Sequence, residues 1–373
     1  MKTVYLDNAA TTAIRPEVIQ EMTKVMMENY GNPSSTHSYG RGAKVLLETS
    51  RKTIASLLNA EAREIIFTSG GTEADNWIIR SAARDLKVQR IISSRVEHHA
   101  VLHAIEAVSA DYGLRVDYVN LLVNGEVDMK HLEELLSKDI PTLVSLMHVN
   151  NETGTILDIQ KVGQLCKQYN AWFHSDAVQS VGKMALDLQN IPVDFIAASA
   201  HKFHGPKGVG FAFIRKNTPL QPIIYGGEQE KGFRAGTEGV HQIVGMAKAL
   251  ELSYQNLQED EKHIASLKEY LMQQLGTHFS GCKINGAGGL YNILNILLPF
   301  DDEKTAMILF NLDMKGIAVS RGSACQSGSV KPSHVLKEML SDEDIKKPSL
   351  RVSFSHYNTK EDIDLLIDAL KSV

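Results

Sequence analysis

Lys202 stands where an apolar stretch meets a glycine- and proline-rich turn. The stretch covers residues 195–198, and the turn lies within residues 199–208, SAHKFHGPKG. Desolvation at the end of a buried strand disfavours an ammonium, so the pKa of a lysine there falls and its amine becomes nucleophilic. Such an amine forms Schiff bases with carbonyl cofactors. A buried lysine is also a common salt-bridge partner, so the other motifs must decide between the two interpretations.

A glycine-rich turn at residues 68–76, TSGGTEADN, lies between a predicted strand and a predicted helix. Glycines let backbone N–H groups approach an anion, Thr72 adds a hydroxyl, and the start of a helix supplies positive potential. The pattern is neither a Walker A motif nor GxGxxG, which favours a single phosphate over a dinucleotide. A plain turn with a threonine N-cap remains the alternative.

Asp176 follows another apolar stretch, within residues 174–179, HSDAVQ. A cationic partner keeps such a carboxylate ionised, and the protonated pyridine nitrogen of pyridoxal phosphate (PLP) is one such partner. A helix N-cap is the competing interpretation.

Two further polar clusters follow predicted strands. In residues 96–101, VEHHAV, His98 could stack on a planar ring and move protons near neutral pH. Metal binding by the adjacent histidines has no support from a carboxylate or cysteine at ligand spacing. Residues 148–154, HVNNETG, offer amides that suit cofactor or substrate hydrogen bonds and are equally common in loops.

Cys325 lies among small residues in 320–329, SRGSACQSGS. Most free cysteines are buried, whereas an exposed thiol near basic groups can ionise and attack. Cys166, on an apolar helical stretch, and Cys282, in a glycine-flanked connection, are predicted to be structural.

Alternating strands and helices must position these motifs. Apolar runs predict strands at residues 64–68, 90–93, 142–148, 172–175, 195–199 and 209–215. Amphipathic stretches predict helices between them, such as 100–112 and 159–169. This order indicates a mainly parallel sheet, whose ligand crevice lies beyond the carboxyl ends of its strands.

The later part of the chain has a different pattern. Residues 241–275 predict one long helix, and after it come an apolar run at 292–298 and strands near Ala318 and Arg351. We therefore expect a second, smaller α+β domain.

Composition excludes several function classes. The 373 residues include 43% hydrophobic and 22% charged residues, as in ordinary globular proteins, and the net charge of −5 predicts neither nucleic-acid nor membrane binding. No apolar run approaches the roughly 20 residues that span a bilayer, and Asp7 comes too early for a secretory signal. Three scattered cysteines form no disulfide framework, so we expect a reducing, cytoplasmic setting.

Together and in this order, the motifs resemble those of the NifS/IscS-type cysteine desulfurases, which are PLP-dependent, aspartate aminotransferase-like proteins of fold type I. The resemblance runs from residues 5–12, YLDNAATT, to about Arg351, and includes residues 31–35, GNPSS, and 234–237, RAGT. It implies an α/β fold with a mainly parallel seven-stranded sheet flanked by helices.

The resemblance also implies two domains. Residues 15–255 would form the large PLP-binding α/β domain. Residues 1–14 and 256–373 would form the small α+β domain, with a mobile catalytic cysteine loop at about 320–332.

The same resemblance implies a role for each motif residue. Lys202 would carry the Schiff base to PLP, and Cys325 would take the sulfur. His98 would stack on the ring and serve in acid–base steps. Asp176 would hold the pyridine nitrogen and Gln179 the ring hydroxyl oxygen.

Further residues would hold the phosphate and the substrate. Asn151 would lie near cofactor and substrate, and Arg351 would bind the substrate carboxylate through a bidentate pair. Thr237 would reach the phosphate of a neighbouring subunit, which implies a homodimer. The other phosphate contacts would come from Gly71, Thr72, Ser199 and His201.

The implied reaction converts L-cysteine to L-alanine and leaves a persulfide on Cys325. Its sulfur would pass to an acceptor protein, either an iron–sulfur scaffold or a tRNA thiolation enzyme. No metal is expected in the catalytic site, although Cys325 could contact an iron–sulfur cluster transiently. The alternative is a selenocysteine lyase or another PLP-dependent, aminotransferase-like enzyme of the same fold; the GSAC sequence at 322–325 argues against an aminotransferase, because transamination needs no cysteine.

Two departures from the family pattern stand out. Arg321 occupies a position that usually holds a small polar residue; it either lowers the pKa of Cys325 or sits in solvent, and solvent is the favoured expectation. The chain stops at Val373, soon after the amphipathic stretch 361–370, whereas many relatives continue into a tail that helps dock the scaffold. That partner is therefore in doubt, but the chemistry is not.

Overall fold

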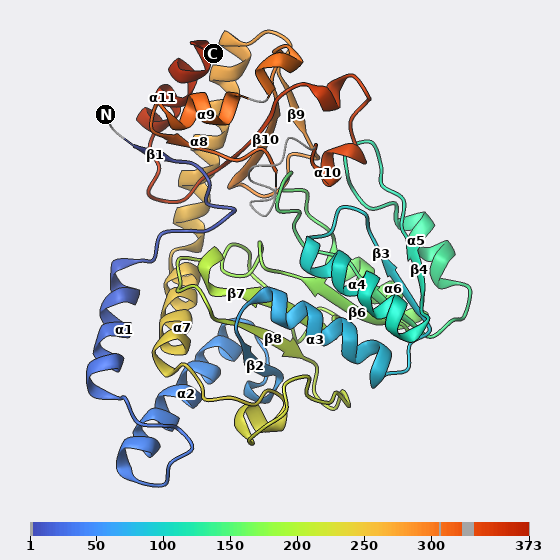
Figure 1. The fold of residues 1–373 in the computed structure, drawn as a ribbon, viewed down its shortest axis with the longest axis vertical. Helices are drawn as coiled ribbons and strands as arrows, with labels where there is room; N and C mark the ends of the chain where they lie inside the picture. Colours follow the sequence, from blue (N-terminus) through green and yellow to red (C-terminus); the bar gives the residue numbers. More distant parts are fainter. Residues whose placement is uncertain (1–2, 306, 323–331, 373) are drawn as a thin grey trace.

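A seven-stranded, mainly parallel sheet forms the centre of the larger unit in the computed structural model, which describes residues 3–305, 307–322 and 332–372 (Figure 1). The strand order is β2-β8-β7-β6-β5-β3-β4, and β8 alone runs antiparallel to its neighbours. This confirms the predicted fold class. The strands are β2 (Ile65–Thr68), β3 (Arg90–Ser93), β4 (Arg115–Tyr118), β5 (Thr142–Ser145), β6 (Trp172–Asp176), β7 (Phe195–Ser199) and β8 (Gly210–Ile214).

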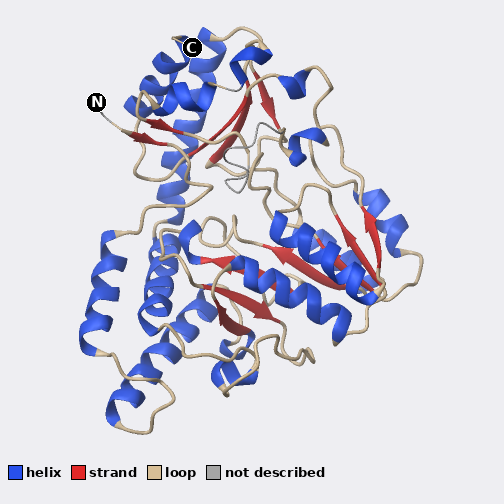
Figure 2. Cartoon of the chain, in the orientation of Figure 1, coloured by secondary structure: helices blue, strands red, loops and turns tan. Residues whose placement is uncertain are grey.

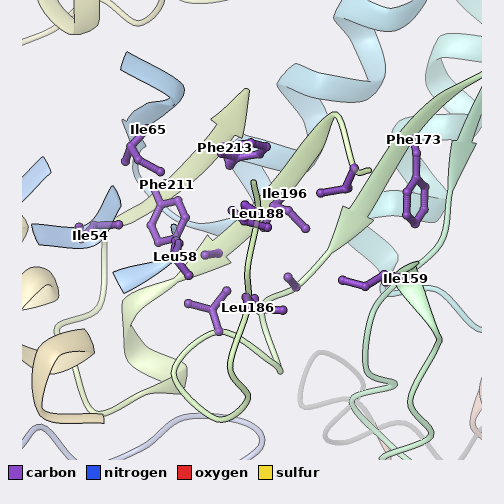
Figure 3. Packing of buried hydrophobic residues seen from close by; sticks show 14 of the residues in the cluster. Ile54, Leu58, Ile65, Ile159, Phe173, Leu186, Leu188, Ile196, Phe211 and Phe213 are labelled. Carbon is purple, nitrogen blue, oxygen red and sulfur yellow. The ribbon is translucent and has the colours of Figure 1, made fainter. Parts of the chain in front are cut away.

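Helices cover both faces of this sheet (Figure 2). The inner strands β7 and β8 are mostly apolar because both of their faces are buried, whereas the edge strand β4 is partly exposed. Alternate residues point to opposite sides, so Ile65 and Phe67 pack in one core while Ile66 packs in the other. Figure 3 shows part of the first core, which contains Ile54, Ile196, Phe211 and Phe213.

The two faces are covered by different helices. The first core contains side chains of α2 (Ser38–Leu57), α5 (Met129–Leu136), α6 (Ile159–Gln168) and α7 (Val240–Gln255). The second contains those of α3 (Gly71–Arg84) and α4 (His99–Tyr112). Helix α1 (Pro16–Glu28) packs on α7.

A smaller unit has a core of its own. Its three-stranded antiparallel sheet has the order β12-β10-β9, and a separate parallel pair joins β1 to β11. Their apolar side chains form one cluster with those of three helices, and the cluster unites Val4 and Leu6 with residues 264–370. The elements are β1 (Val4–Tyr5), α8 (Leu257–His278), β9 (Lys283–Asn285), β10 (Ile293–Leu297), α9 (Ile308–Asp313), β11 (Ile317–Ala318), α10 (His334–Lys337), β12 (Ser349–Ser353) and α11 (Lys360–Lys371).

The single long helix predicted over residues 241–275 is wrong, because the chain forms α7 and α8 with a break at Asn256. The backbone there departs from helical geometry, with φ −101° and ψ 7°. The side-chain amide of Asn256 donates to the Leu252 carbonyl, a local bond that competes with helix continuation. On either side of the break the two helices enter different cores.

Within the described ranges, no helix is long and apolar enough to cross a bilayer.

Candidate functional site

A cavity of about 250 Å³ opens beyond the carboxyl ends of the parallel strands. It gathers all the predicted site residues except Thr237 and Cys325. Thr237 is exposed and does not line this cavity, and Cys325 lies outside the described residues. The predicted residues in its lining are Gly71, Thr72, His98, Asn151, Asp176, Gln179, Ser199, His201, Lys202 and Arg351.

Lys202 lies in a single 3-10 turn, Ala200–Lys202, that directly follows β7. Its Nζ donates to the carbonyl oxygens of Ala9 at 2.7 Å and Ala10 at 2.8 Å. Thr12 fixes the turn, because its N–H and its hydroxyl both donate to the His201 carbonyl. The N-terminal segment therefore holds the amine at the cavity wall.

Asp176 is the last residue of β6 and is buried beneath the cavity. One carboxylate oxygen accepts the Val178 N–H at 2.9 Å. Burial raises the pKa of Asp176 to about 6, against the opposing effects of that hydrogen bond and of the Lys202 charge. A cation placed against this carboxylate would stabilise its ionised form.

The start of α3 forms one wall of the cavity, at a point where there is no room for a side chain. A Cβ on Gly71 would lie 2.5 Å from Cγ2 of Val178, so only glycine allows the helix to begin so close to the β6 loop. Gly71 and Thr72 are its first two residues and line the cavity. Backbone N–H groups at the start of a helix, with the helix dipole, favour an anion.

His98 is the N-cap of α4, and its Nδ1 accepts the Ala100 N–H at 3.1 Å. Burial, and then the charge of Lys202, lower the pKa of His98 to about 4. The ring is therefore neutral at pH 7, and because Nδ1 is an acceptor, Nε2 carries the proton. His201, whose Nδ1 lies 3.1 Å from the Thr11 hydroxyl, also has its pKa lowered to about 4, first of all by burial.

Gln179 belongs to a hydrogen-bond chain that the sequence did not reveal. Its Nε2 donates to the Ala9 carbonyl at 2.9 Å, and its Oε1 accepts from Lys183 Nζ at 3.0 Å. Burial, with the charges of Lys202 and Arg351, lowers the pKa of Lys183 to about 7. The spacing of Lys183 four residues after Gln179 is the signal that could have predicted the pair.

Arg351 is a buried arginine in β12, brought to the cavity by the smaller unit. Its Nη2 forms an ion pair with Asp7 at 2.7 Å, and its Nη1 donates to the Asn151 carbonyl at 3.0 Å. Asp7 therefore orients the guanidinium, a role that sequence reasoning missed.

Asp75 is a second buried carboxyl group in the cavity lining. It lies 3.3 Å from His174 Nε2, and His174 Nδ1 is 2.9 Å from the Ser145 hydroxyl. Burial, and then the nearby Asp176 charge, raise the pKa of Asp75 well above its usual value. Its place within TEADN resembles an exposed helical position, so its burial could not be predicted from the local pattern.

Arg321 does not sit in solvent, so that expectation is wrong. The side chain is half-buried, and its Nη1 donates to the Thr305 carbonyl at 2.8 Å. The carbonyls at the end of a 3-10 turn provide an acceptor that the sequence did not indicate.

The other two cysteines are poor nucleophiles. Burial raises the pKa of Cys166, and it raises the pKa of half-buried Cys282 to about 11. Among residues 3–305, 307–322 and 332–372, no cluster of histidine, cysteine, aspartate or glutamate side chains is arranged to hold a metal ion.

Comparison with known proteins adds a consistent picture. Residues 4–366 match the family described as aminotransferase class-V. "Cysteine desulfurase IscS" of Dictyoglomus turgidum is 41% identical over 375 residues, which cover 99% of this chain and 94% of the relative. "Putative cysteine desulfurase IscS 1" of Bacillus subtilis is 41% identical over 369 residues, covering 97% and 96%.

Solved structures agree with these relatives. A chain described as "NIFS-LIKE PROTEIN" superposes with a TM-score of 0.91 at 37% identity, covering 100% of this chain and 99% of that one. A NifS-like protein from Rickettsia africae superposes with a TM-score of 0.88 at 35% identity, with the same coverage.

Proposed function

The chain belongs to the aminotransferase class-V family, and on that premise we propose that it is a PLP-dependent cysteine desulfurase. It converts L-cysteine to L-alanine and transfers the sulfur to Cys325. One observation carries the proposal: a single cavity combines the amine of Lys202, the carboxylate of Asp176, the start of α3 and the guanidinium of Arg351.

The residues of this cavity fit PLP. Asp176 is a buried carboxylate with a raised pKa, and a pyridinium N–H would compensate its charge. Gly71, where any Cβ would collide with Val178, leaves the N–H groups of α3 accessible to a phosphate. Ser199 and His201 line the same cavity and would add phosphate contacts. When bound, PLP supplies an aldehyde for amines and an electron-withdrawing ring.

The protein groups around the ring then have separate tasks. With PLP bound, Asp176 would hold the proton on the pyridine nitrogen and so keep the ring electron-withdrawing. Neutral His98 offers its ring face for stacking and its Nε2–H as a proton donor. Gln179 keeps one Nε2 hydrogen for the ring hydroxyl oxygen, because its other polar contacts are with Ala9 and Lys183.

Arg351 binds the carboxylate of L-cysteine. A guanidinium can hold two oxygens in a bidentate pair, which fixes the orientation of the amino acid. Asp7 keeps the guanidinium in place. The positive charge of Arg351 must then be shared between Asp7 and the incoming carboxylate. Lys202 Nζ, released from the Ala9 and Ala10 carbonyls, takes the α-proton of the substrate.

Sulfur transfer to Cys325 needs no external oxidant. The Cys325 thiolate attacks the substrate sulfur, an S–S bond forms, and the Cβ–S bond of the substrate breaks. The electron pair of that bond stays with the carbon, which takes up a proton and leaves as L-alanine. A thiol reductant then releases the sulfur as sulfide, or an acceptor protein takes it.

The assembly and the acceptor complete the proposal. The exposed position of Thr237 suits a contact to the phosphate of a second subunit, so we infer a homodimer. The relatives named IscS favour an iron–sulfur scaffold as acceptor, and a tRNA thiolation enzyme is the other acceptor that we propose. The need for a free thiol supports a reducing, cytoplasmic compartment.

The decisive experiment measures products from L-cysteine in the presence of a thiol reductant. The wild type should release alanine and sulfide in equal amounts. Cys325→Ala should keep the yellow colour of the bound cofactor but lose sulfide release, whereas Lys202→Ala should lose the absorbance that requires the bond between lysine and cofactor.

Cys282→Ala is the matched control, because it removes a half-buried thiol with a raised pKa. It should keep both products. Normal sulfide release by Cys325→Ala would overturn the role of Cys325, and an unchanged spectrum of Lys202→Ala would overturn that of Lys202.

A further inference from the structure

The two ends of the segment that carries Cys325 meet at one buried carboxylate, that of Glu152. On the near side, a Cβ on Gly322 would lie 3.3 Å from Oε2 and 3.5 Å from Oε1 of Glu152, so the Gly322 backbone packs against the carboxylate. On the far side, Ser333 Oγ donates to Oε2 at 2.5 Å. Glu152 itself has no exposed surface.

The backbone of Glu152 is fixed by both units of the fold. Its N–H donates to the Asn150 side chain at 2.9 Å, and its carbonyl accepts from Asn295 of β10 at 3.1 Å. Its neighbour Asn151 lines the cavity and accepts from Arg351. The carboxylate therefore stands one residue away from the cavity wall without being part of the lining.

Two further contacts attach the same ends to a cavity residue and to the neighbour of another. Ser320 and Arg351 exchange backbone hydrogen bonds of 2.6 and 3.3 Å. His334, at the start of α10, donates from Nε2 to the carbonyl of Glu97 at 2.9 Å, next to His98. In Figure 1, α10 lies at the boundary between the two units.

A buried carboxylate is an expensive way to fill space. Burying a polar group costs roughly 1–3 kcal/mol unless hydrogen bonds compensate it, and an apolar side chain would pack there at no such cost. Glu152 instead joins two chain ends that are 11 residues apart, from 322 to 333. The hydrogen-bonding chemistry of its side chain suits Glu152 to hold these chain ends in place rather than to fill a hydrophobic core.

The contacts of Gly322 and Ser333 with Glu152 bear on the nucleophile, because both residues lie close to Cys325 in the sequence. Cys325 follows Gly322 by only three residues in the sequence, so the thiol belongs to the chain that continues directly from the Gly322 contact. The effective concentration of a thiol at its target depends steeply on such placement. Loss of the anchor would therefore affect sulfur transfer more than it affects the chemistry at the cofactor.

We propose that Glu152 is a positioning residue for sulfur transfer, which fixes the two ends of the Cys325 segment through Gly322 and Ser333. The inference rests on the proposed desulfurase activity. Glu152 contacts neither substrate nor cofactor in this assignment; it acts through the segment.

The test separates two steps of a single turnover of the holoenzyme. Stopped-flow absorbance after mixing with L-cysteine reports the steps at the cofactor, and mass spectrometry of quenched samples reports the persulfide on Cys325. In Ser333→Ala and Glu152→Gln, we expect the absorbance change to stay within about twofold of the wild type and persulfide formation to slow by about tenfold or more.

Ser333 also caps α10, because its Oγ accepts the N–H groups of Val335 and Leu336, so loss of the cap needs its own control. Ser333→Thr keeps a hydroxyl that both caps the helix and donates to Glu152, and it should restore persulfide formation. Asp128→Ala removes the N-cap of α5, whose carboxylate accepts the N–H groups of Lys130 and His131, and should leave both steps unchanged.

The outcomes are distinct. Equal slowing of both steps in Ser333→Ala and Glu152→Gln would overturn the positioning role, as would normal persulfide formation in both. A wild type that forms no alanine from L-cysteine would instead overturn the proposed function, whatever the variants do.

Discussion

Two buried groups that titrate near neutral pH lie at the cavity wall and directly behind it. Burial raises the pKa of Asp176 to about 6 and lowers that of Lys183 to about 7. A cationic ring nitrogen beside Asp176 would drive that carboxyl to its ionised form, so cofactor binding should be linked to proton release. Burial, and then the Asp176 charge, raise the pKa of Asp75 well above its usual value, so ionisation of this second carboxyl group is disfavoured beside Asp176.

His148 allows the effect of burial to be tested on a single side chain. It follows β5, is buried, and its Nδ1 lies 2.9 Å from the Ser180 hydroxyl. Burial lowers its pKa to about 4, with Asp158 opposing. Below pH 6.5 the unfolded chain binds a proton that the folded chain refuses, so stability falls as the pH drops from 6.5 towards 4. The titration of His148 alone lowers the free energy of unfolding by about 3 kcal/mol between pH 6.5 and pH 4.

We therefore expect His148→Gln to reduce the loss of unfolding free energy between pH 7 and pH 4 by about 3 kcal/mol. Urea unfolding of the cofactor-free protein, followed by the fluorescence of Trp77 and Trp172, measures this difference in the larger unit. His278→Gln replaces an exposed histidine and should leave the difference as in the wild type. The same pH dependence in His148→Gln and the wild type would contradict the argument.

At the scale of single elements, the start of α3 is set by its contact with the loop after β6. In Gly71→Ala the new methyl group would lie 2.5 Å from Cγ2 of Val178, so the helix start must shift. The affinity for PLP should fall by about tenfold or more, because the N–H groups that face the phosphate move with it. Fluorescence titration of the cofactor-free protein with PLP measures this loss.

Gly276→Ala is the matched control. Gly276 lies inside α8, and no atom lies within 4 Å of its added Cβ. Alanine in a helix interior stabilises by about 0.5–1 kcal/mol relative to glycine, so this variant should be slightly more stable and bind PLP normally. Unchanged PLP affinity in Gly71→Ala would show that α3 does not hold the phosphate.

Buried elements could be predicted from the sequence more readily than edges and interruptions. Strand β7, with Lys202 just after it, is a run of apolar and small residues that only a strand between two helical layers accommodates. Strand β4 was missed because it is an edge strand in which Arg115 and Asp117 alternate with Val116 and Tyr118. The break at Asn256 was missed because the helical periodicity continues across it.

The site shows the same limit. Motif residues at strand ends were brought together as predicted, because parallel strands share one carboxyl edge. Asp7, Asp75 and Lys183 were not predicted, because each acts through a partner far away in the sequence or in a neighbouring layer. Which buried polar groups pair is decided by packing, and no local pattern encodes it.

At the scale of the whole molecule, the cavity lies between two separate cores. Ala9, Ala10 and Arg351 come from segments joined to the smaller unit, and the other lining residues come from the larger one. A boundary between units is a common place for a ligand site. This arrangement supports the proposed division at residues 15 and 255.

An exposed apolar patch on α1 and α2 gives the homodimer a testable surface. Met27 of α1 and Val45 of α2 are 74% and 65% exposed, and the ring of Tyr30, just after α1, stacks on that of Tyr39 in α2 with centroids 5.5 Å apart. Contiguous exposed apolar side chains mark interaction sites in globular proteins. Thr237 does not line the cavity of its own chain. The proposed contact between Thr237 and a phosphate therefore requires a second copy of the chain.

We expect light scattering to give twice the chain mass of 41.2 kDa for the wild type. Val45→Glu places a charge in the patch and should shift the protein towards monomers, because burying an unpaired charge costs several kcal/mol. The affinity for PLP should then fall by about tenfold, because the partner's contact to the phosphate is lost. Val123→Glu, on a side chain that is 94% exposed in the loop after β4, should change neither mass nor affinity. A monomeric wild type that binds PLP tightly would contradict both the dimer and the role of Thr237, because a complete site in one chain needs no residue from a second.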